Sequence, residues 1–302
     1  MVQYKNTKDT KDAKIKKFTG LNRDIIDKFY TSKQTVDICY KYIINNLKIK
    51  NTDLIIEPSA GNGAFIPIIK KLSNNYIFYD IKPENDAIIK KDFLKLKNPS
   101  SSAKIHIIGN PPFGRKSSLA IKFIKKSCEF CDTISFILPK SFKKDSMKKS
   151  FPLNFHLKFQ KDLPNNSFLT PSKYDKNIIK TNSYNVPCVF QIWIKKNKNR
   201  KLIPKEISKF FIFCKKTDTF PYTPDAAIRR VGINAGKVYL NDIQSKNINS
   251  HYFIKIIKNK DIIINNRYNL FNNTVGPKSI GRQELIKFYN NLSHTISDSN
   301  KI

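Results

Sequence analysis

The residues with the clearest chemical potential are Asn110-Pro111-Pro112-Phe113, which directly follow the apolar run 105–109. The amide oxygen of Asn110 and the carbonyl oxygen of Pro111 are two acceptors that can take both hydrogens of a planar amino group. This draws the nitrogen lone pair out of conjugation and aims it at an electrophile. The prolines stiffen the loop and lack N–H donors, while the phenyl ring offers a face for stacking. The loop therefore predicts a site that activates an amino group, with a plain Pro-Pro turn after a buried strand as the competing interpretation.

A second group of residues lies about fifty positions earlier in the chain. An apolar run ends at Glu57 and breaks into the turn Pro-Ser-Ala-Gly-Asn-Gly (58–63), ahead of the helical stretch 66–72. Glycines in such a turn let a ligand approach the backbone closely. Because the full G-x-G-x-x-G spacing is missing, an ordinary strand-to-helix turn stays open when this segment is taken alone. Its position ahead of the Asn-Pro-Pro-Phe loop favours a ligand-binding turn.

The elements that must position these groups alternate between strand and helix patterns. The predicted strands are 53–57, 76–80, 87–90, 105–109 and 133–138, and the predicted helices are one that follows the N-cap Ser32 and ends near 45–48, then 64–72, 117–129 and 141–149. Such alternation implies a parallel sheet with helices on both faces, an α/β Rossmann-like fold. Ligands of these sheets bind at the carboxyl ends of the strands, where Glu57 and Asp80 fall. Asp92 and Asn110 fall there as well.

A hairpin is expected at the end of this sheet. Two long strands are predicted at about 153–160 and 186–195, and the connection between them is long, polar and contains prolines. A connection of this kind inside a hairpin is more often functional or disordered than structural. Phe168 and Tyr174 in it are candidates to sandwich a planar substrate against Phe113. For both residues, anchoring the loop to the core is the competing role.

These motifs together resemble the amino-methylating, S-adenosylmethionine-dependent methyltransferases, in particular the adenine-N6 DNA methyltransferases. In that family the cofactor motifs precede an Asn-Pro-Pro-aromatic motif and a target-recognition region follows it; the matching blocks run through 19–195, about three fifths of the chain. The resemblance implies S-adenosylmethionine as cofactor, no metal, and an adenine flipped out of the nucleic acid as acceptor. Phe113 departs from the commoner tyrosine, and this variant also occurs in RNA adenine methyltransferases. RNA, and less so a protein glutamine, therefore remain alternatives to DNA.

The same resemblance assigns the site residues. Those assigned to the cofactor are Phe29, Tyr30, Thr31, Glu57, Pro58, Ala60, Gly61, Gly63, Asp80, Asp92 and Phe93, and those assigned to catalysis are Asn110, Pro111, Pro112 and Phe113. The aromatic segment 29–31 would cup the methionine end of the cofactor, and Glu57 would lie near its amino group. Asp80 would accept from the ribose hydroxyls, as an acid about twenty residues beyond a glycine turn does. Asp92 would accept from the cofactor's adenine amino group and Phe93 would pack on that ring. For each aspartate alone, a solvated carboxylate at a loop end is the alternative.

The charge of the chain indicates the kind of partner. Lys and Arg total 56 against 23 Asp and Glu, which gives a formal net charge of +33. So large an excess attracts polyanions and releases their counterions on contact. Nucleic acid is therefore favoured over a protein or a small molecule, with DNA favoured over RNA. Adenine- and thymine-rich codons can also inflate the lysine content, but a basic surface stays basic whatever its origin.

The remaining composition predicts a soluble, intracellular protein without a membrane span, expected as a monomer. No apolar run approaches the ~20 residues that cross a bilayer, and the first residues contain no signal-type apolar stretch. The five cysteines are an odd number and suit reduced thiols. Cys128 and Cys131 form a single C-x-x-C pair, for which helix packing is favoured over zinc.

Beyond residue 200 the strand-helix alternation ends. Short strands are predicted at 210–214, 226–231, 237–240 and 252–257, before a closing helix at 282–292. This pattern predicts a small, mostly β substrate-recognition domain. Arg229 and Arg230 adjoin a glycine-bearing turn and could reach phosphates or guanine edges, with a solvated basic face as the alternative. The predicted organisation is a flexible basic arm (1–18), a methyltransferase domain (19–199) and a recognition domain (200–302).

Overall fold

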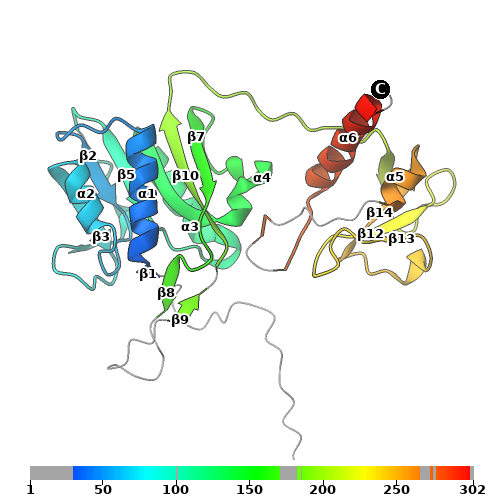
Figure 1. Cartoon of the computed structure of the whole chain (residues 1–302), viewed down its shortest axis with the longest axis horizontal. Helices are drawn as coiled ribbons and strands as arrows, with labels where there is room; N and C mark the ends of the chain where they lie inside the picture. Colours follow the sequence, from blue (N-terminus) through cyan, green and yellow to red (C-terminus); the bar gives the residue numbers. More distant parts are fainter. Residues whose placement is uncertain are drawn as a thin grey trace, which may run out of the picture.

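The computed structural model describes residues 30–99, 101–170, 182–184, 186–265, 273–274 and 277–299. The predicted arm at 1–18, together with Phe29 and Tyr174, lies outside these residues. Figure 1 shows an α/β part and a smaller C-terminal part joined by an extended segment. Within the residues described, no helix combines the length and the apolar character needed to cross a bilayer.

The α/β part is built on a seven-stranded sheet with the order β4-β3-β2-β5-β6-β10-β7. Its strands are β2 (Leu54–Glu57), β3 (Asn75–Asp80), β4 (Ile89–Lys90), β5 (Ile105–Gly109), β6 (Thr133–Pro139), β7 (Phe155–Asp162) and β10 (Cys188–Lys195). In this order each pair of adjacent strands from β4 through β6 is parallel. The strand β10 is antiparallel to both of its neighbours, β6 and β7. The expected parallel sheet with a hairpin at its end is therefore confirmed.

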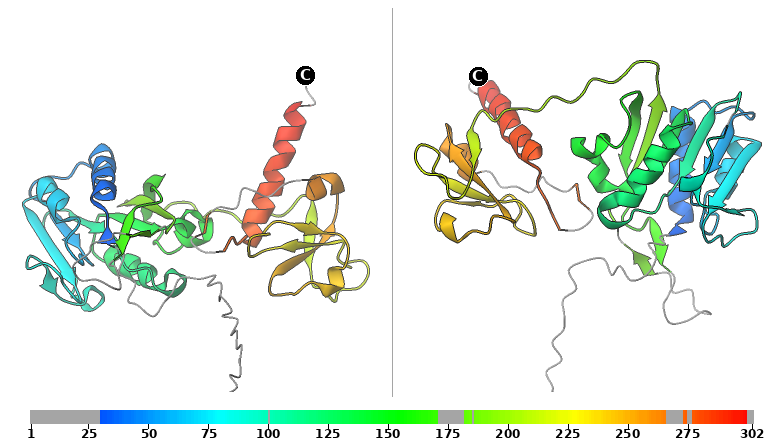
Figure 2. Two further views of the ribbon diagram at one scale, coloured as in Figure 1. Left: turned by 60° about the horizontal axis from the view of Figure 1, so that its bottom comes forward. Right: turned by 180° about the vertical axis from the view of Figure 1, so that it is seen from behind.

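Helices cover both faces of this sheet, as predicted. The helices α1 (Lys33–Asn46) and α2 (Ile66–Leu72) lie on one face and α3 (Ser118–Cys128) on the other (Figures 1 and 2). Successive strand side chains point to opposite faces. Ile55 accordingly packs in the core under α1 and α2, and its neighbour Ile56 packs in the core under α3. Two apolar layers thus hold the sheet rigid between the helices.

Shorter elements connect the sheet and helices. They are β1 (Tyr30–Thr31), η1 (Phe93–Lys95), η2 (Arg115–Ser117), η3 (Lys140–Lys143), α4 (Asp145–Lys148), β8 (Phe168–Thr170) and β9 (Asn182–Tyr184). The start of α1 is confirmed, because the Ser32 hydroxyl accepts from the Thr35 N–H at 3.3 Å as an N-cap. The predicted helix 141–149 is wrong. The chain there forms η3 and then α4, because the backbone of Lys144 between them is extended (φ −69°, ψ 140°).

A small second sheet brings the hairpin connection to the start of α1. In it β8 pairs antiparallel with both β1 and β9. Tyr30 lies opposite Leu169 and Thr31 opposite Phe168, and the Ser32 N–H donates to the carbonyl of Ser167 at 2.9 Å. The polar connection between the two long strands therefore returns to the loop end of the large sheet.

The C-terminal part contains a four-stranded antiparallel sheet with the order β11-β14-β12-β13. Its elements are β11 (Phe211–Cys214), β12 (Ala226–Arg229), β13 (Val238–Tyr239), η4 (Ile243–Ser245), β14 (His251–Ile256), α5 (Lys260–Asn265) and α6 (Arg282–Ser299). Leu285 and Tyr289 of α6 pack with Ile228 and Ile254 of the sheet. The predicted strands and closing helix are present, although β12 ends at Arg229. The helix α5 was not expected, since its run of three isoleucines favours a strand.

Two ion pairs and a hydrogen bond join α6 and the segment before it to the α4 region. Lys144 Nζ lies 3.0 Å from Glu284 Oε2, and Lys287 Nζ lies 2.6 Å from Asp145 Oδ2. Lys144 Nζ also donates to the carbonyl of Ser279 at 2.9 Å. All four charged groups are partly exposed, so each pair alone stabilises little. Together they place the start of α6 against the α/β part.

Arg200 anchors the chain where it leaves the α/β part. Its Nε donates to the carbonyl of Phe155 at 3.0 Å, and its Nη2 donates to the carbonyls of Lys148 and Phe151 at 2.9 and 2.8 Å. The guanidinium also lies 5.8 Å from the centre of the Trp193 ring, which is buried and stacked on Phe151. The planar guanidinium of Arg200 thus donates hydrogen bonds to three backbone carbonyl groups at once.

Replacing Arg200 with lysine should lower the free energy of unfolding by about 1–3 kcal/mol, because an ammonium cannot reproduce three bonds in fixed directions. Urea unfolding followed by circular dichroism measures the change. The exposed neighbour Lys201 provides the control, and Lys201→Ala should stay within about 0.5 kcal/mol of the parent protein. Equal effects of the two substitutions would contradict the anchoring role.

Candidate active site

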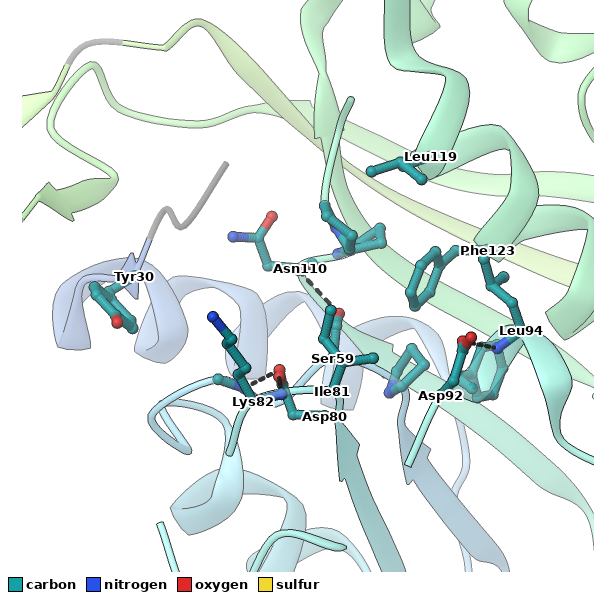
Figure 3. A pocket seen from close by; sticks show the side chains of 15 residues that line it. Tyr30, Ser59, Asp80, Ile81, Lys82, Asp92, Leu94, Asn110, Leu119 and Phe123 are labelled. Atoms are coloured by element: carbon teal, nitrogen blue, oxygen red, sulfur yellow. Dashed lines mark hydrogen bonds between the residues drawn. The ribbon is translucent and has the colours of Figure 1, made fainter. Parts of the chain in front are cut away.

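A cavity of about 370 Å³ lies at the carboxyl ends of β2, β3 and β5 (Figure 3). It is lined by Tyr30, Pro58, Ser59, Gly61, Asp80, Ile81, Lys82, Asp92, Phe93, Leu94, Asn110, Pro111, Pro112, Leu119 and Phe123. This volume lies in the range of about 300–1,000 Å³ that is usual for small-molecule sites. The wall is largely apolar, with carboxylates at Asp80 and Asp92 and an amide at Asn110. Such a lining suits a flat, partly polar ligand.

The structure brings most of the sequence-predicted residues to this one cavity. The predicted residues that line it are Tyr30, Pro58, Gly61, Asp80, Asp92, Phe93, Asn110, Pro111 and Pro112. Those that do not line it, but lie in the segments that form its walls or in β8, are Thr31, Glu57, Ala60, Gly63, Phe113 and Phe168. The two groups together come from six separate segments, so the expected convergence at the carboxyl edge of the sheet is present.

The glycine turn is tied to the end of β3 by the carboxylate of Asp80. Its Oδ2 accepts from the N–H of Gly61 at 2.8 Å, and its Oδ1 accepts from the N–H of Lys82 at 2.7 Å. Gly63 adopts φ +86°, a backbone conformation that strains any residue with a Cβ, so glycine is strongly favoured there. Each carboxylate oxygen has a further lone pair directed away from these N–H groups. The pair of oxygens can therefore also accept from ligand hydroxyls.

The Asn110 loop is held in place by two hydrogen bonds from other segments. The amide Nδ2 of Asn110 donates to Thr31 Oγ1 at 3.3 Å, and Ser59 Oγ donates to the backbone carbonyl of Asn110 at 3.2 Å. Figure 3 shows Asn110 above Asp80 and Lys82, with Ser59 between them. The plane of the amide is thus set by β1 and the backbone by the glycine turn. Preorganisation of this kind is what a loop needs to orient an acceptor group.

Phe113 and Phe168 pack on each other behind this loop. Their ring centroids are 6.4 Å apart with an interplanar angle of 82°, an edge-to-face contact. Phe113 is 7% exposed and Phe168 is fully buried. In this arrangement Phe168 has the anchoring role, which is one of the two roles that the sequence allows. The edge-to-face contact leaves no room for a planar ligand between the two rings. The connection that carries Phe168 therefore packs against the end of the Asn110 loop.

Glu57 is a buried acid next to the cavity. It is 2% exposed, and its Cγ lies 3.2 Å from where a Cβ on Gly109 would stand, so its side chain packs under the backbone that leads to Asn110. Burial, reinforced by the nearby Asp80 carboxylate, raises the pKa of Glu57 to about 8. Among the residues that the structure describes, none donates a hydrogen bond to its Oε2. A cationic ligand group nearby would favour the ionised form.

The buried acid predicts a measurable pH dependence of stability. Because the pKa of Glu57 is raised in the folded state above its unfolded value near 4.5, the folded state binds more protons between about pH 5 and 8. Its contribution to the free energy of unfolding therefore falls as pH rises through this window, by up to about 1.4 kcal/mol per pH unit. In Glu57→Gln this slope should be absent.

Chemical unfolding of the ligand-free protein at several pH values measures the difference between the two proteins. Comparing the variant with its parent cancels the contribution of His106, whose burial lowers its pKa and which affects both proteins alike. Parallel curves for the two proteins from pH 5 to 8 would show that Glu57 is not held protonated by its surroundings.

Several cavity residues were not assigned from the sequence. They are Ser59, Ile81, Lys82, Leu94, Leu119 and Phe123. Adjacency to assigned residues could have identified four of them, since Ser59 lies between Pro58 and Ala60, Ile81 and Lys82 follow Asp80, and Leu94 follows Phe93. Leu119 and Phe123 are four positions apart on α3 and therefore share one face of that helix. No local motif marks that face as part of a ligand site.

Arg229 and Arg230 do not line the cavity. Arg229 donates from Nε to the carbonyl of Val231 at 2.9 Å and from Nη1 to Ser250 Oγ at 3.2 Å. The guanidinium of Arg230 lies 5.4 Å from the centre of the Tyr252 ring. Both are partly exposed in the C-terminal sheet. Their role as substrate-binding residues therefore stays a prediction that concerns a surface apart from the cavity.

The parallel sheet, the glycine turn and the Asn-Pro-Pro loop at one cavity define a methyltransferase-type domain. The chain matches the model of the EDM2 methyltransferase-like domain over residues 48–205, more than half of its 302 residues. It therefore belongs to the EDM2 methyltransferase-like domain family. The resemblance seen in the sequence is confirmed at this level, and the matched range contains both the glycine turn and the Asn110 loop.

Solved structures with partial similarity include methyltransferases of several kinds. The 23S rRNA methyltransferase ErmE is 12% identical, with a TM-score of 0.43 over 57% of this chain and 71% of its own. A putative RNA methyltransferase from Pyrococcus horikoshii is 14% identical (TM-score 0.38, 54% and 81%). A type I restriction-modification methyltransferase subunit from Streptococcus thermophilus is 15% identical (TM-score 0.39, 56% and 45%). No curated protein matches the chain. The family match therefore identifies the class.

Proposed function

We propose that the chain transfers a methyl group from S-adenosylmethionine to the N6 amino group of adenine in DNA. The observation that carries this proposal is one cavity in which the Asp80-bound glycine turn faces the Asn110 loop (Figure 3). The turn is suited to a nucleoside-bearing donor, and the loop is suited to an amino-group acceptor. The glycine turn and the Asn110 loop line the same cavity, so a donor and an acceptor bound there would lie next to each other without a rearrangement of the fold.

The residues at the cavity fit S-adenosylmethionine. Asp80 would accept from the ribose hydroxyls, and Asp92 would accept from the adenine amino group. Ile81 and Phe93 provide apolar surfaces for the adenine ring. Glu57, which is buried beside the cavity, would lie near the positively charged methionine end and be ionised by it. When bound, S-adenosylmethionine supplies a methyl group made electrophilic by its sulfonium.

The catalytic contribution of the chain is orientation. Asn110 and Pro111 would accept the two hydrogens of N6, which directs the nitrogen lone pair toward the donor. Thr31 and Ser59 hold the loop for this purpose. No histidine lines the cavity among the residues described. The excess proton can leave to water after transfer, so a general base is not required.

The choice of nucleic acid rests on charge and on the order of the motifs. The net charge of +33 favours a polyanion. The cofactor turn precedes the Asn-Pro-Pro loop and a separate C-terminal part follows, which supports a DNA enzyme with a recognition region. In this proposal 19–199 form the catalytic domain, 200–302 the recognition domain, and 1–18 an accessory basic arm. Adenine would be flipped from the duplex into the cavity, at a cost of a few kcal/mol.

Replacing Asn110 with alanine should reduce methyl transfer at least about 100-fold, because one of the two acceptors for N6 is lost. Affinity for S-adenosylmethionine in calorimetry should stay within a few fold, since the donor side of the cavity is untouched. Asn51→Ala, at an exposed position away from the cavity, is the matched control and should retain both properties. Near-normal turnover of the Asn110 variant would show that the catalytic loop is wrongly assigned.

The substrate assignment is tested with tritiated S-adenosylmethionine and matched duplex DNA, RNA and glutamine-containing peptides. Transfer should occur to duplex DNA and be lost when its adenines are replaced by purine, which lacks the N6 amino group. Transfer to RNA alone would replace DNA by RNA in the proposal. Transfer to peptide alone, or binding of the cofactor without transfer to any of the three, would reject it.

A further inference from the structure

An isoleucine stands in solvent at the turn between β12 and β13. Ile233 is 89% exposed and lies in the segment Val231–Gly236, here called the tip turn. An exposed isoleucine alone is ordinary, but this one is presented by an ordered turn. The N–H of Ala235 donates to the carbonyl of Gly232 at 3.0 Å, and that of Gly236 donates to the carbonyl of Arg229 at 2.7 Å. These two backbone hydrogen bonds fix the turn in which the exposed side chain of Ile233 lies.

The tip turn is fastened to the segment that precedes α6. The Gly232 N–H donates to the carbonyl of Lys278 at 2.8 Å, and Val231 forms a β-bridge with Ser279. The carbonyl of Ser279 also accepts from Lys144 Nζ of the α/β part at 2.9 Å. A continuous set of contacts therefore connects the tip turn with the part that contains the cavity. The turn is anchored at the junction of the two parts and is not a free loop.

Basic residues flank the exposed isoleucine in sequence, and the guanidinium of Arg229 lies near Gly232 of the tip turn. Arg229 and Arg230 precede the tip turn and Lys237 follows it, while Lys278 contacts its backbone. The tip turn itself contains no acidic residue. A hydrophobic protein surface would have to bury these partly exposed cations, at a cost in desolvation. Nucleic acid accepts both features, because its phosphates pair with cations while its base steps accept an apolar wedge.

We infer that the tip turn is a wedge that inserts Ile233 between stacked bases of the nucleic acid while the flanking arginines and lysines contact its phosphates. The inference rests on the proposed function in one respect, the choice of nucleic acid as ligand. It adds a second contact surface, separate from the cavity, that helps to open the stack. Arg229 and Arg230 then act as phosphate contacts that position the wedge.

The test measures binding without cofactor, so that it does not depend on methyl transfer. The probe is duplex DNA carrying 2-aminopurine beside adenine, with anisotropy reporting affinity and 2-aminopurine fluorescence reporting unstacking. Ile233→Ala should weaken binding about tenfold at fixed salt and lose most of the fluorescence increase. Ile233→Leu should restore both. Ile233→Lys should also weaken binding, although it adds a positive charge.

Ile207 is the matched control, since it is an isoleucine with 88% exposure in the connecting segment. Ile207→Ala should bind like the parent protein. Equal binding by Ile207→Ala and Ile233→Ala, or tighter binding by Ile233→Lys, would overturn the wedge and leave only electrostatic contact. Weaker binding by Ile233→Ala with no methyl transfer to any nucleic acid would support the wedge while rejecting the proposed catalytic function. All variants should show parent-like circular dichroism, because the side chain is in solvent.

Discussion

The candidate site depends on one carboxylate, that of Asp80, at the end of β3. Its two oxygens accept from the backbone N–H groups of Gly61 and Lys82, and so join the turn after β2 to the turn after β3. The glycine turn in turn carries Ser59, whose hydroxyl holds the backbone of Asn110 after β5. Three neighbouring strand ends are therefore fixed to one another by polar contacts. The sheet already places these strand ends side by side, and the polar contacts fix the loops that follow them.

Much of the large sheet could be predicted because its signals are local. Apolar runs of strand length alternate with helical spacing, and the predicted β5 at 105–109 has the observed bounds. The failures occur where distant contacts decide. Lys144 bends the predicted helix 141–149 while its side chain reaches Ser279 and Glu284, more than 130 positions away. The isoleucines of α5 have strand propensity, yet Ile263 packs in a helix under the C-terminal sheet.

The residues of the candidate site also fall into two groups, those that the sequence could predict and those that it could not. Residues that carry a chemical signal, such as Asp80 and Asn110, were identified from type and spacing. The apolar wall from Leu119 and Phe123 was missed, since a leucine and a phenylalanine on an amphipathic helix look the same whether they face a core or a ligand. The burial of Glu57, which changes its acid strength, depends on how closely Gly109 approaches it. Spacing along the chain contains no information about that approach.

The pairing of β1 with β8 connects one wall of the cavity with a segment more than 130 positions further along the chain. Tyr30 lines the cavity, and its hydroxyl donates to the carboxylate of Glu84 at 2.7 Å, while its strand partner Leu169 belongs to the hairpin connection. A molecule that binds against Tyr30 therefore stabilises the pairing of β1 with β8, although β8 does not line the cavity. By thermodynamic linkage, anything that stabilises the pairing of β8 with β1 raises the affinity for that molecule by the same factor. Binding in the cavity and the pairing of β1 with β8 are therefore thermodynamically coupled.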